Sequence, residues 1–223
     1  MNNSNLVDRE SSVGNDLPES EIEAIAREYE KSIYIPGKKN KRQIFLAPVG
    51  LVAAGKSTVL DLLCERLSLA RVSGDDIRLL LRDKGYNYLK TLDIANLVLL
   101  GLLDQGYSIA VDSDCISIDV RKAIQAYKEK YSFQDIWIHI NPPEKFIEDK
   151  LSKMKYEKSG IFSNKEEALA NFYERMPLHK EYVSKIKYLY EFDTSRDDIR
   201  EQAEEFIALL EKPIISNHYL SSF

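Results

Sequence analysis

The stretch GLVAAGKST, residues Gly50–Thr58, decides the fold of this chain. It fits the pattern Gly-x-x-x-x-Gly-Lys-Ser, in which a lysine and a hydroxyl residue follow the second glycine. The apolar run QIFLAPV, Gln43–Val49, precedes it and predicts a buried strand, although Pro48 is unusual near a strand end. Helical periodicity over Thr58–Leu67 follows it. A strand, this loop and a helix in that order predict one βα unit of a parallel α/β fold.

The composition of the loop is typical of a phosphate cradle, or P-loop. Glycines let the backbone curl so that its N–H groups point inward, and the N-terminal end of the following helix adds positive potential. Lys56 would reach the β- and γ-phosphates of a nucleoside triphosphate, and the Ser57 hydroxyl would ligate Mg²⁺. We therefore expect ATP and Mg²⁺ as cofactors, although the choice between ATP and GTP is not legible. The residues expected to hold the nucleotide are Gly50, Ala53, Ala54, Gly55, Lys56, Ser57 and Thr58.

Strands and helices alternate through the rest of the chain, which predicts a five-stranded parallel sheet with helices on both faces, a three-layer α/β sandwich. The expected strands after the loop are Ala70–Ser73, Tyr107–Val111, Asp135–Ile140 and Tyr188–Asp193. The expected helices are Asp75–Arg82, Thr91–Leu103, Asp119–Tyr131, Glu144–Met154, Lys165–Met176 and Ile199–Leu210. Residues 43–211 form one domain in this interpretation. Residues 1–18 and 212–223 are expected to be tails, and residues 19–42 a helix and linker whose role, covering the sheet edge or the acceptor pocket, stays open.

Composition limits the classes of protein. The 223 residues are 44% hydrophobic and 30% charged, and no apolar run approaches the roughly 18 residues of a membrane span. The N-terminus lacks the features of a secretory signal, and two cysteines, Cys64 and Cys115, are too few for a disulfide framework. We expect a cytoplasmic protein with both cysteines buried. The net charge of −5 favours a small-molecule acceptor over nucleic acid, although a local basic groove could bind nucleic acid.

The stretch Ser73–Arg78, SGDDIR, follows the second expected strand. With the P-loop, its Asp-Asp-x-Arg resembles the kinase group that includes polynucleotide 5′-kinases, zeta-toxin-type sugar-nucleotide kinases and chloramphenicol phosphotransferase. The resemblance implies that Asp75 accepts the proton of the acceptor hydroxyl and that Arg78 clamps the substrate or phosphate. A carboxylate within hydrogen-bond reach of the acceptor is what this chemistry requires. The alternative is that Asp75 or Asp76 only caps the following helix.

The same resemblance assigns roles to further residues. Asp112, at the end of the third strand, would hold Mg²⁺ through water, and Asp114 stands where the group often has Asn and would contact the acceptor. Arg121 falls where many members have an Arg on the following helix. Ala53 departs from the group, whose members usually carry Gly there in a left-handed conformation. Alanine in that conformation costs about 1–2 kcal/mol.

The group also implies a mobile lid, here at about residues 150–176, that excludes water during transfer. Lysines stand where arginines are usual, so Lys153, Lys155 and Lys158 are the expected phosphate contacts, with solvated surface charges as the alternative. The helix end Asn171–Met176 also resembles that of polynucleotide kinases. The segment Asp193–Arg196 would contact adenine or, alternatively, cap a helix.

Taken together, these residues predict a kinase that transfers the γ-phosphate of ATP to a hydroxyl of a small-molecule or nucleotide-containing acceptor. A polynucleotide 5′-kinase is one alternative, for which residues 82–90 could form a basic channel. A zeta-toxin-like sugar-nucleotide kinase, a non-catalytic ATP-binding switch and a degenerate kinase used as a scaffold also stay open. The sequence does not indicate a protein partner.

Overall fold

The computed structural model describes residues 14–156 and 161–211. Its centre is a five-stranded sheet in the order β2-β3-β1-β4-β5, with every neighbouring pair parallel. The strands are β1 (Ile44–Val49), β2 (Leu69–Ser73), β3 (Ser108–Asp112), β4 (Gln134–Ile140) and β5 (Tyr190–Phe192). The parallel α/β sheet predicted from the alternation of strands and helices is confirmed.

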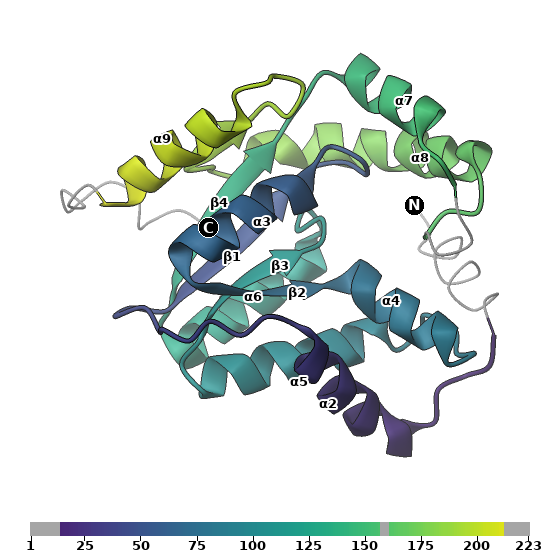
Figure 1. Ribbon diagram of the computed structural model, residues 1–223, viewed down its shortest axis with the longest axis vertical. Coiled ribbons are helices and arrows are strands. Elements are labelled where there is room, and N and C mark those ends of the chain that lie inside the picture. The colour runs from purple at the N-terminus through teal and green to yellow at the C-terminus, as the bar shows by residue number, and fades with distance from the viewer. Residues whose placement is uncertain (1–13, 157–160, 212–223) are drawn as a thin grey trace.

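Helices cover both faces of the sheet and so make three layers (Figure 1). The α-helices are α2 (Ile22–Ser32), α3 (Lys56–Leu67), α4 (Gly74–Asp83), α5 (Thr91–Asp104), α6 (Ile118–Tyr131), α7 (Glu144–Lys153), α8 (Lys165–Tyr182) and α9 (Ile199–Glu211). Two short 3₁₀ helices, η1 (Glu19–Glu21) and η2 (Val183–Lys185), complete the described elements. Helices α7 and α8 lie together at one end of the molecule, and α2, α4 and α5 lie at the other (Figure 1).

Alternation along the strands divides the core into two clusters, because successive side chains of a strand point to opposite faces. In β1, Phe45, Ala47 and Val49 pack with residues of α2, α4, α5 and α6. Leu46 packs on the other face with residues of α3, α7, α8 and α9. Both faces of the sheet are therefore buried, which explains why the strands read as continuous apolar runs.

Helix α8 is longer than the sequence predicts. It continues through Pro177 to Tyr182, whereas the expected helix was Lys165–Met176. Proline removes one backbone donor from a helix, but the helix continues here because His179 beyond it is buried and its carbonyl accepts the N–H of Val183. The last strand is correspondingly shorter than expected, Tyr190–Phe192.

The chain before α2 has contacts that differ from those of a mobile tail. Asn15 accepts a hydrogen bond from the backbone N–H of Asn87 at 2.8 Å and donates its own to the carbonyl of Gly85 at 2.9 Å. Leu17 is buried in the core shared with α2. The expectation of a tail is therefore wrong for residues 14–18, because one buried leucine and these backbone bonds anchor them. Residues 1–13 and the expected tail 212–223 lie outside the described residues.

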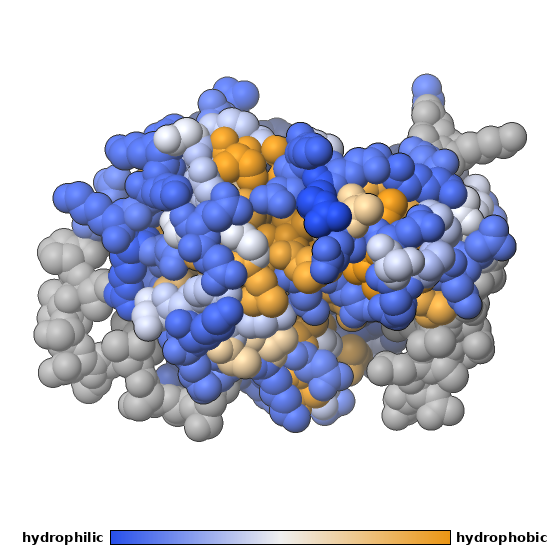
Figure 2. Space-filling view, turned by 90° about the horizontal axis from the view of Figure 1, so that it is seen from below, coloured by the Kyte–Doolittle hydropathy of each residue, from blue (hydrophilic) through white to orange (hydrophobic). Residues whose placement is uncertain are grey.

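The surface is mainly hydrophilic on the side shown in Figure 2, with apolar residues gathered toward the middle of the view. Within residues 14–156 and 161–211, none of the helices is long and apolar enough to cross a membrane. The expected cytoplasmic location stays a prediction. Cys64 and Cys115 are free thiols and both are buried, as the sequence predicts.

Candidate functional site

A cavity of about 480 Å³ opens at the carboxyl ends of the strands, between α4 on one side and α7 and α8 on the other. In open parallel sheets this edge is where ligands bind. The side chains that share the cavity come from the P-loop, the start of α4, the segment between α4 and α5, the end of β3, and helices α7 and α8. They include Ala53, Lys56, Ser57, Thr58, Asp75, Arg78, Tyr88, Asp112, Asp114, Lys150, Asn171 and Arg175.

The backbone of the P-loop explains its glycines. A Cβ atom at Gly50 would lie 2.7 Å from the carbonyl oxygen of Ile140 on β4, so only glycine fits this close approach. Gly55 has a φ of +97°, and a Cβ there would also meet Thr194 at 2.8 Å. Ala53 has a φ of +59°, so it adopts the left-handed conformation expected of a glycine. Ala53 therefore carries the strain that this conformation imposes on a residue with a side chain.

Side chains from other elements brace the P-loop. The ammonium of Lys56 donates to the carbonyl oxygens of Gly50 and Leu51 at 2.8 and 2.9 Å. Asp114 accepts the backbone N–H of Gly50 at 3.3 Å, so this residue supports the loop as well as lining the cavity. The hydroxyl of Thr194 donates to the carbonyl of Ala54 at 2.6 Å. The segment Asp193–Arg196, expected to contact adenine, therefore contacts the P-loop directly.

The donor set at the end of β3 fits Mg²⁺. Ser57 lies exposed in the first turn of α3 and Asp112 is buried at the end of β3, and both line the cavity. Hydroxyl and carboxylate oxygens are the ligands that Mg²⁺ prefers, with phosphates and waters completing its shell. Residues 14–156 and 161–211 contain no group of three or more His, Cys, Asp or Glu able to hold a metal. A site with one or two protein ligands is typical of Mg²⁺, whose remaining ligands are phosphates and waters.

On the acceptor side, the cap of α4 is Ser73 rather than either aspartate. The Ser73 hydroxyl accepts the backbone N–H of Asp76 at 3.2 Å. Asp75 is thus not needed as the cap. Its exposed carboxylate lines the cavity and accepts a hydrogen bond from Arg78 at 3.2 Å. Asp75 and Arg78 both line this cavity, whereas Asp76 does not.

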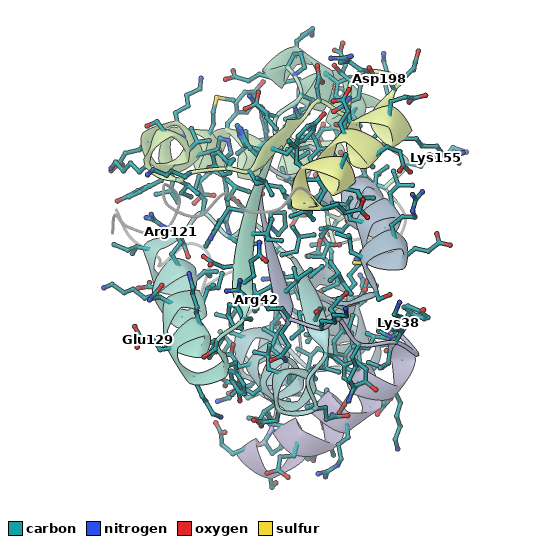
Figure 3. The ribbon with its side chains drawn as sticks, turned by 90° about the vertical axis from the view of Figure 1, so that its left-hand side faces the viewer. Lys38, Arg42, Arg121, Glu129, Lys155 and Asp198 are labelled. Atoms are coloured by element: carbon teal, nitrogen blue, oxygen red, sulfur yellow. The ribbon has the colours of Figure 1, made fainter. Side chains whose placement is uncertain are left out.

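The cations of α7 and α8 that line the cavity differ from those expected for the lid. Lys150 of α7 and Arg175 of α8 line it, whereas Lys153 and Lys155 are exposed and do not. Lys155 points away from the body of the molecule (Figure 3). The pKa of Lys150 is lowered, mainly because its ammonium is partly buried and to a lesser extent because the positive charge of Lys56 is nearby. Lys158 lies outside the described residues.

Helical geometry explains this difference. In α7, Ile147 and Leu151 are buried, and Lys150, one turn after Ile147, lines the cavity beside this buried face. In α8, Asn171 and Arg175 are four residues apart and therefore share one face, next to buried Phe172. The spacing of these two residues could have indicated Arg175, but the rotation of α7 depends on packing between distant elements.

The basic segment 82–90 does not form an open cationic channel. Lys84 pairs with Glu28 at 2.8 Å, and Lys90 pairs with Glu19. The hydroxyl of Tyr86 donates to Glu21 at 2.8 Å, and Tyr88 is buried. Acidic residues of η1 and α2 therefore neutralise much of the segment that a polynucleotide-binding groove would need.

Arg121 lies at the start of α6, over the ring of Tyr182 at 5.5 Å, and does not line the cavity (Figure 3).

A second cavity of about 740 Å³ lies between α2, α3 and β2. None of its lining residues belongs to the P-loop, and it contains neither Asp75 nor the lid cations. We assign the candidate functional site to the smaller cavity, because residues of the P-loop, the Asp75–Arg78 pair and residues of α7 and α8 converge there.

The model of the AAA domain family matches residues 46–178. That region includes the P-loop and the residues that line the cavity. The chain therefore belongs to the AAA domain family. No curated protein sequence matches the chain.

Solved structures resemble this chain at low sequence identity. A candidate kinase from Chloroflexus aurantiacus is 14% identical, with a TM-score of 0.56 over 77% of this chain and 100% of that one. The APS kinase CysC of Mycobacterium tuberculosis, solved with AMPPNP and APS, is 19% identical, with a TM-score of 0.49 over 77% and 99%. A structure from the PezAT toxin-antitoxin system of Streptococcus pneumoniae is 15% identical, with a TM-score of 0.49 over 88% and 98%. The chain therefore shares its fold with the Chloroflexus aurantiacus structure.

Proposed function

We propose that this protein is an ATP- and Mg²⁺-dependent kinase that transfers the γ-phosphate to a hydroxyl group of a small molecule. The observation that carries the proposal is that one cavity is lined by Lys56 of the P-loop, the Asp75–Arg78 pair, Asp112 and two lid cations. These are the groups that phosphoryl transfer needs, since its catalysis is mainly positioning and charge stabilisation.

In the proposed mechanism, the triphosphate lies on the backbone N–H groups of the P-loop at the start of α3, and Lys56 contacts its β- and γ-phosphates. Mg²⁺, held by Ser57 and Asp112, would supply charge neutralisation on the phosphate oxygens. The contact between Thr194 and the P-loop supports an adenine position beside Asp193–Arg196.

The transfer step replaces one P–O bond by another. The acceptor oxygen bonds to the γ-phosphorus while the bond from that phosphorus to the β–γ bridging oxygen breaks, and ADP leaves. Asp75 takes the proton of the acceptor hydroxyl, and Arg78 holds the acceptor side. Lys150 and Arg175 stabilise the charge that develops on the transferred group and help to exclude water.

A small-molecule acceptor is favoured because the basic residues between 82 and 90 are paired with acidic residues of η1 and α2. A polynucleotide acceptor would require uncommitted cations along its backbone path. A nucleotide-containing small acceptor, such as a sugar nucleotide, fits the same cavity and remains within the proposal.

The test is label transfer from γ-labelled ATP with Mg²⁺ to separate pools of small alcohols, nucleosides, sugar nucleotides and a 5′-hydroxyl oligonucleotide. We expect label on a small acceptor with the wild-type protein. Asp75→Asn should keep ATP binding and lose transfer, because only the base is removed. Label on the oligonucleotide would contradict the acceptor class, and ATP binding without transfer to any pool would favour a nucleotide-binding switch.

A further inference from the structure

Arg71, in the middle of β2, bonds two carboxylates from two other elements. Its Nε and Nη2 both donate to Oδ2 of Asp112, at 2.9 and 2.5 Å. Its Nη1 donates to Oδ1 of Asp61 on α3 at 2.8 Å. All three nitrogens of the guanidinium are therefore engaged, in the forked geometry that arginine provides and lysine does not.

The two carboxylates are connected to the two proposed ligands of Mg²⁺. Asp112 is itself one of them, and Asp61 lies four residues after Ser57, one turn further along the same face of α3. Ser57 and Asp112 come from separate elements, so a metal site between them depends on how α3 is held against β3. Arg71 joins these elements from a third one, β2.

The burial of the three side chains indicates what the contact does. The Asp112 side chain is only 7% exposed, against 28% for Arg71 and 63% for Asp61. A buried carboxylate requires a cation or hydrogen-bond donors, and Arg71 supplies both to Oδ2. Among the described residues, Oδ1 of Asp112 has no hydrogen-bond partner. Asp112 lines the nucleotide cavity but Arg71 does not, so one carboxylate oxygen is fixed and the other is left for the cavity.

We propose that Arg71 is a positioning residue for the metal site. The Asp61–Arg71–Asp112 bridge fixes the orientation of the Asp112 carboxylate and its placement relative to Ser57, so that the pair binds the Mg²⁺ of the nucleotide complex. This inference rests on the proposed function. Arg71 does not touch the nucleotide; it acts through Asp112, as partners of metal-binding carboxylates do.

Arg71 can be replaced without leaving a hole in the apolar core. It lines the larger cavity, of about 740 Å³, together with Asp61 and Tyr29. A shorter side chain at position 71 would therefore enlarge a space that already exists. Arg66 offers a matched control, because it is an arginine at the end of α3 that pairs with Glu204 of α9 on the surface.

The experiment measures binding of a fluorescent ATP analogue to the full chain, first in EDTA and then during titration with Mg²⁺. For Arg71→Ala we expect unchanged affinity in EDTA and a Mg²⁺ half-saturation raised about 10–100-fold, the usual effect of losing a partner of a metal ligand. Arg71→Lys should give an intermediate increase, Asp61→Ala a smaller one, and Arg66→Ala none.

The outcomes separate this inference from the proposed function. Unchanged Mg²⁺ dependence in Arg71→Ala would overturn the positioning role, and so would a weakening of binding in EDTA as large as that in Mg²⁺. Equal weakening in EDTA and in Mg²⁺ would make Arg71 a general support of the fold. If Arg71→Ala does not fold, the Mg²⁺ dependence of Arg71→Lys distinguishes the positioning role from this general support. Failure of the wild-type protein to bind the analogue at all would instead contradict the proposed function.

Discussion

The hydroxyl of Tyr29 bonds both backbone groups of Ser73. It accepts the N–H of Ser73 at 2.7 Å and donates to its carbonyl oxygen at 3.3 Å. Ser73 ends β2, the outer strand of the sheet, so its backbone has no further strand to pair with. Helix α2 thus covers the sheet edge, which is one of the two roles left open for the N-terminal helix. Ser73 is also the cap of α4, so the contact supports the segment that presents Asp75.

Removing this hydroxyl should destabilise the protein. Tyr29→Phe would leave the buried N–H of Ser73 without its partner, and we expect the free energy of unfolding to fall by about 1–3 kcal/mol. Burial of the same hydroxyl raises the pKa of Tyr29 to about 12. Urea unfolding at neutral pH measures the change. Tyr34→Phe is the control, because Tyr34 is 67% exposed, and an equal loss in both variants would refute the role of the buried contact.

Ala53 should be the strained residue of the P-loop. Its φ of +59° costs an alanine about 1–2 kcal/mol, of which the greater chain entropy of glycine offsets part. We expect Ala53→Gly to stabilise the protein by about 0.5–1 kcal/mol in urea unfolding. Ala54→Gly is the matched control and should destabilise it, since Ala54 is buried and its φ is not positive. Loss of stability in Ala53→Gly would show that the loop strain is compensated elsewhere.

The lid cations can be tested as a set. Arg175→Ala and Lys150→Ala should each lower the rate of phosphoryl transfer by about 10²-fold, because each removes a donor to the developing charge. Lys153→Ala and Lys155→Ala, outside the cavity, should leave the rate nearly unchanged. Steady-state transfer with a labelled acceptor measures all four. A lower rate in Lys153→Ala and Lys155→Ala, with no change in Lys150→Ala and Arg175→Ala, would instead support the phosphate contacts expected from the sequence.

The buried histidine of α8 predicts a pH dependence of stability. His179 is 7% exposed and its Nδ1 has no hydrogen-bond partner among the described residues. The pKa of His179 is lowered, mainly by burial. The negative charge of Asp114 opposes this shift, and His139 and Lys56 add to it. In the unfolded chain His179 has a pKa of about 6.5. It therefore takes up a proton more readily there than in the folded protein.

Stability should consequently be full above that pH and fall as the pH decreases, with a slope of up to about 1.4 kcal/mol per pH unit from this group. Unfolding in urea between pH 8 and pH 5 measures it. We expect His179→Gln to reduce the slope of the unfolding free energy against pH. The difference between the two proteins at pH 8 gives the part of the effect that does not depend on pH. An identical slope in both proteins would contradict the assignment to His179.

The sequence predicted best those features that depend on local chemistry. The P-loop could be placed residue by residue, because its backbone geometry is encoded in the glycines and the lysine that follows them. Asp75, Arg78 and Asp112 could be brought to one cavity because the carboxyl ends of parallel strands meet at one edge of the sheet.

The features that were not predicted depend on packing between distant segments. Lys150 rather than Lys153 faces the cavity because α7 is rotated by its buried contacts. The pairs Arg71–Asp112 and Tyr29–Ser73 join residues far apart in the chain, and no local pattern indicates either of them. The acidic partners of Lys84 and Lys90 were missed for the same reason.

The most direct test of the central claim is calorimetric binding of ATP, with Mg²⁺ present, to the wild-type protein and to Lys56→Ala. The central claim is that the P-loop cavity holds a triphosphate through Lys56 and the loop backbone. We expect saturable binding at one site in the wild type and a loss of affinity of about 10-fold or more in Lys56→Ala, since a charge-assisted contact is worth about 1.5–3 kcal/mol. Lys153→Ala should bind as the wild type does. Equal affinity in the wild type and Lys56→Ala would contradict the account.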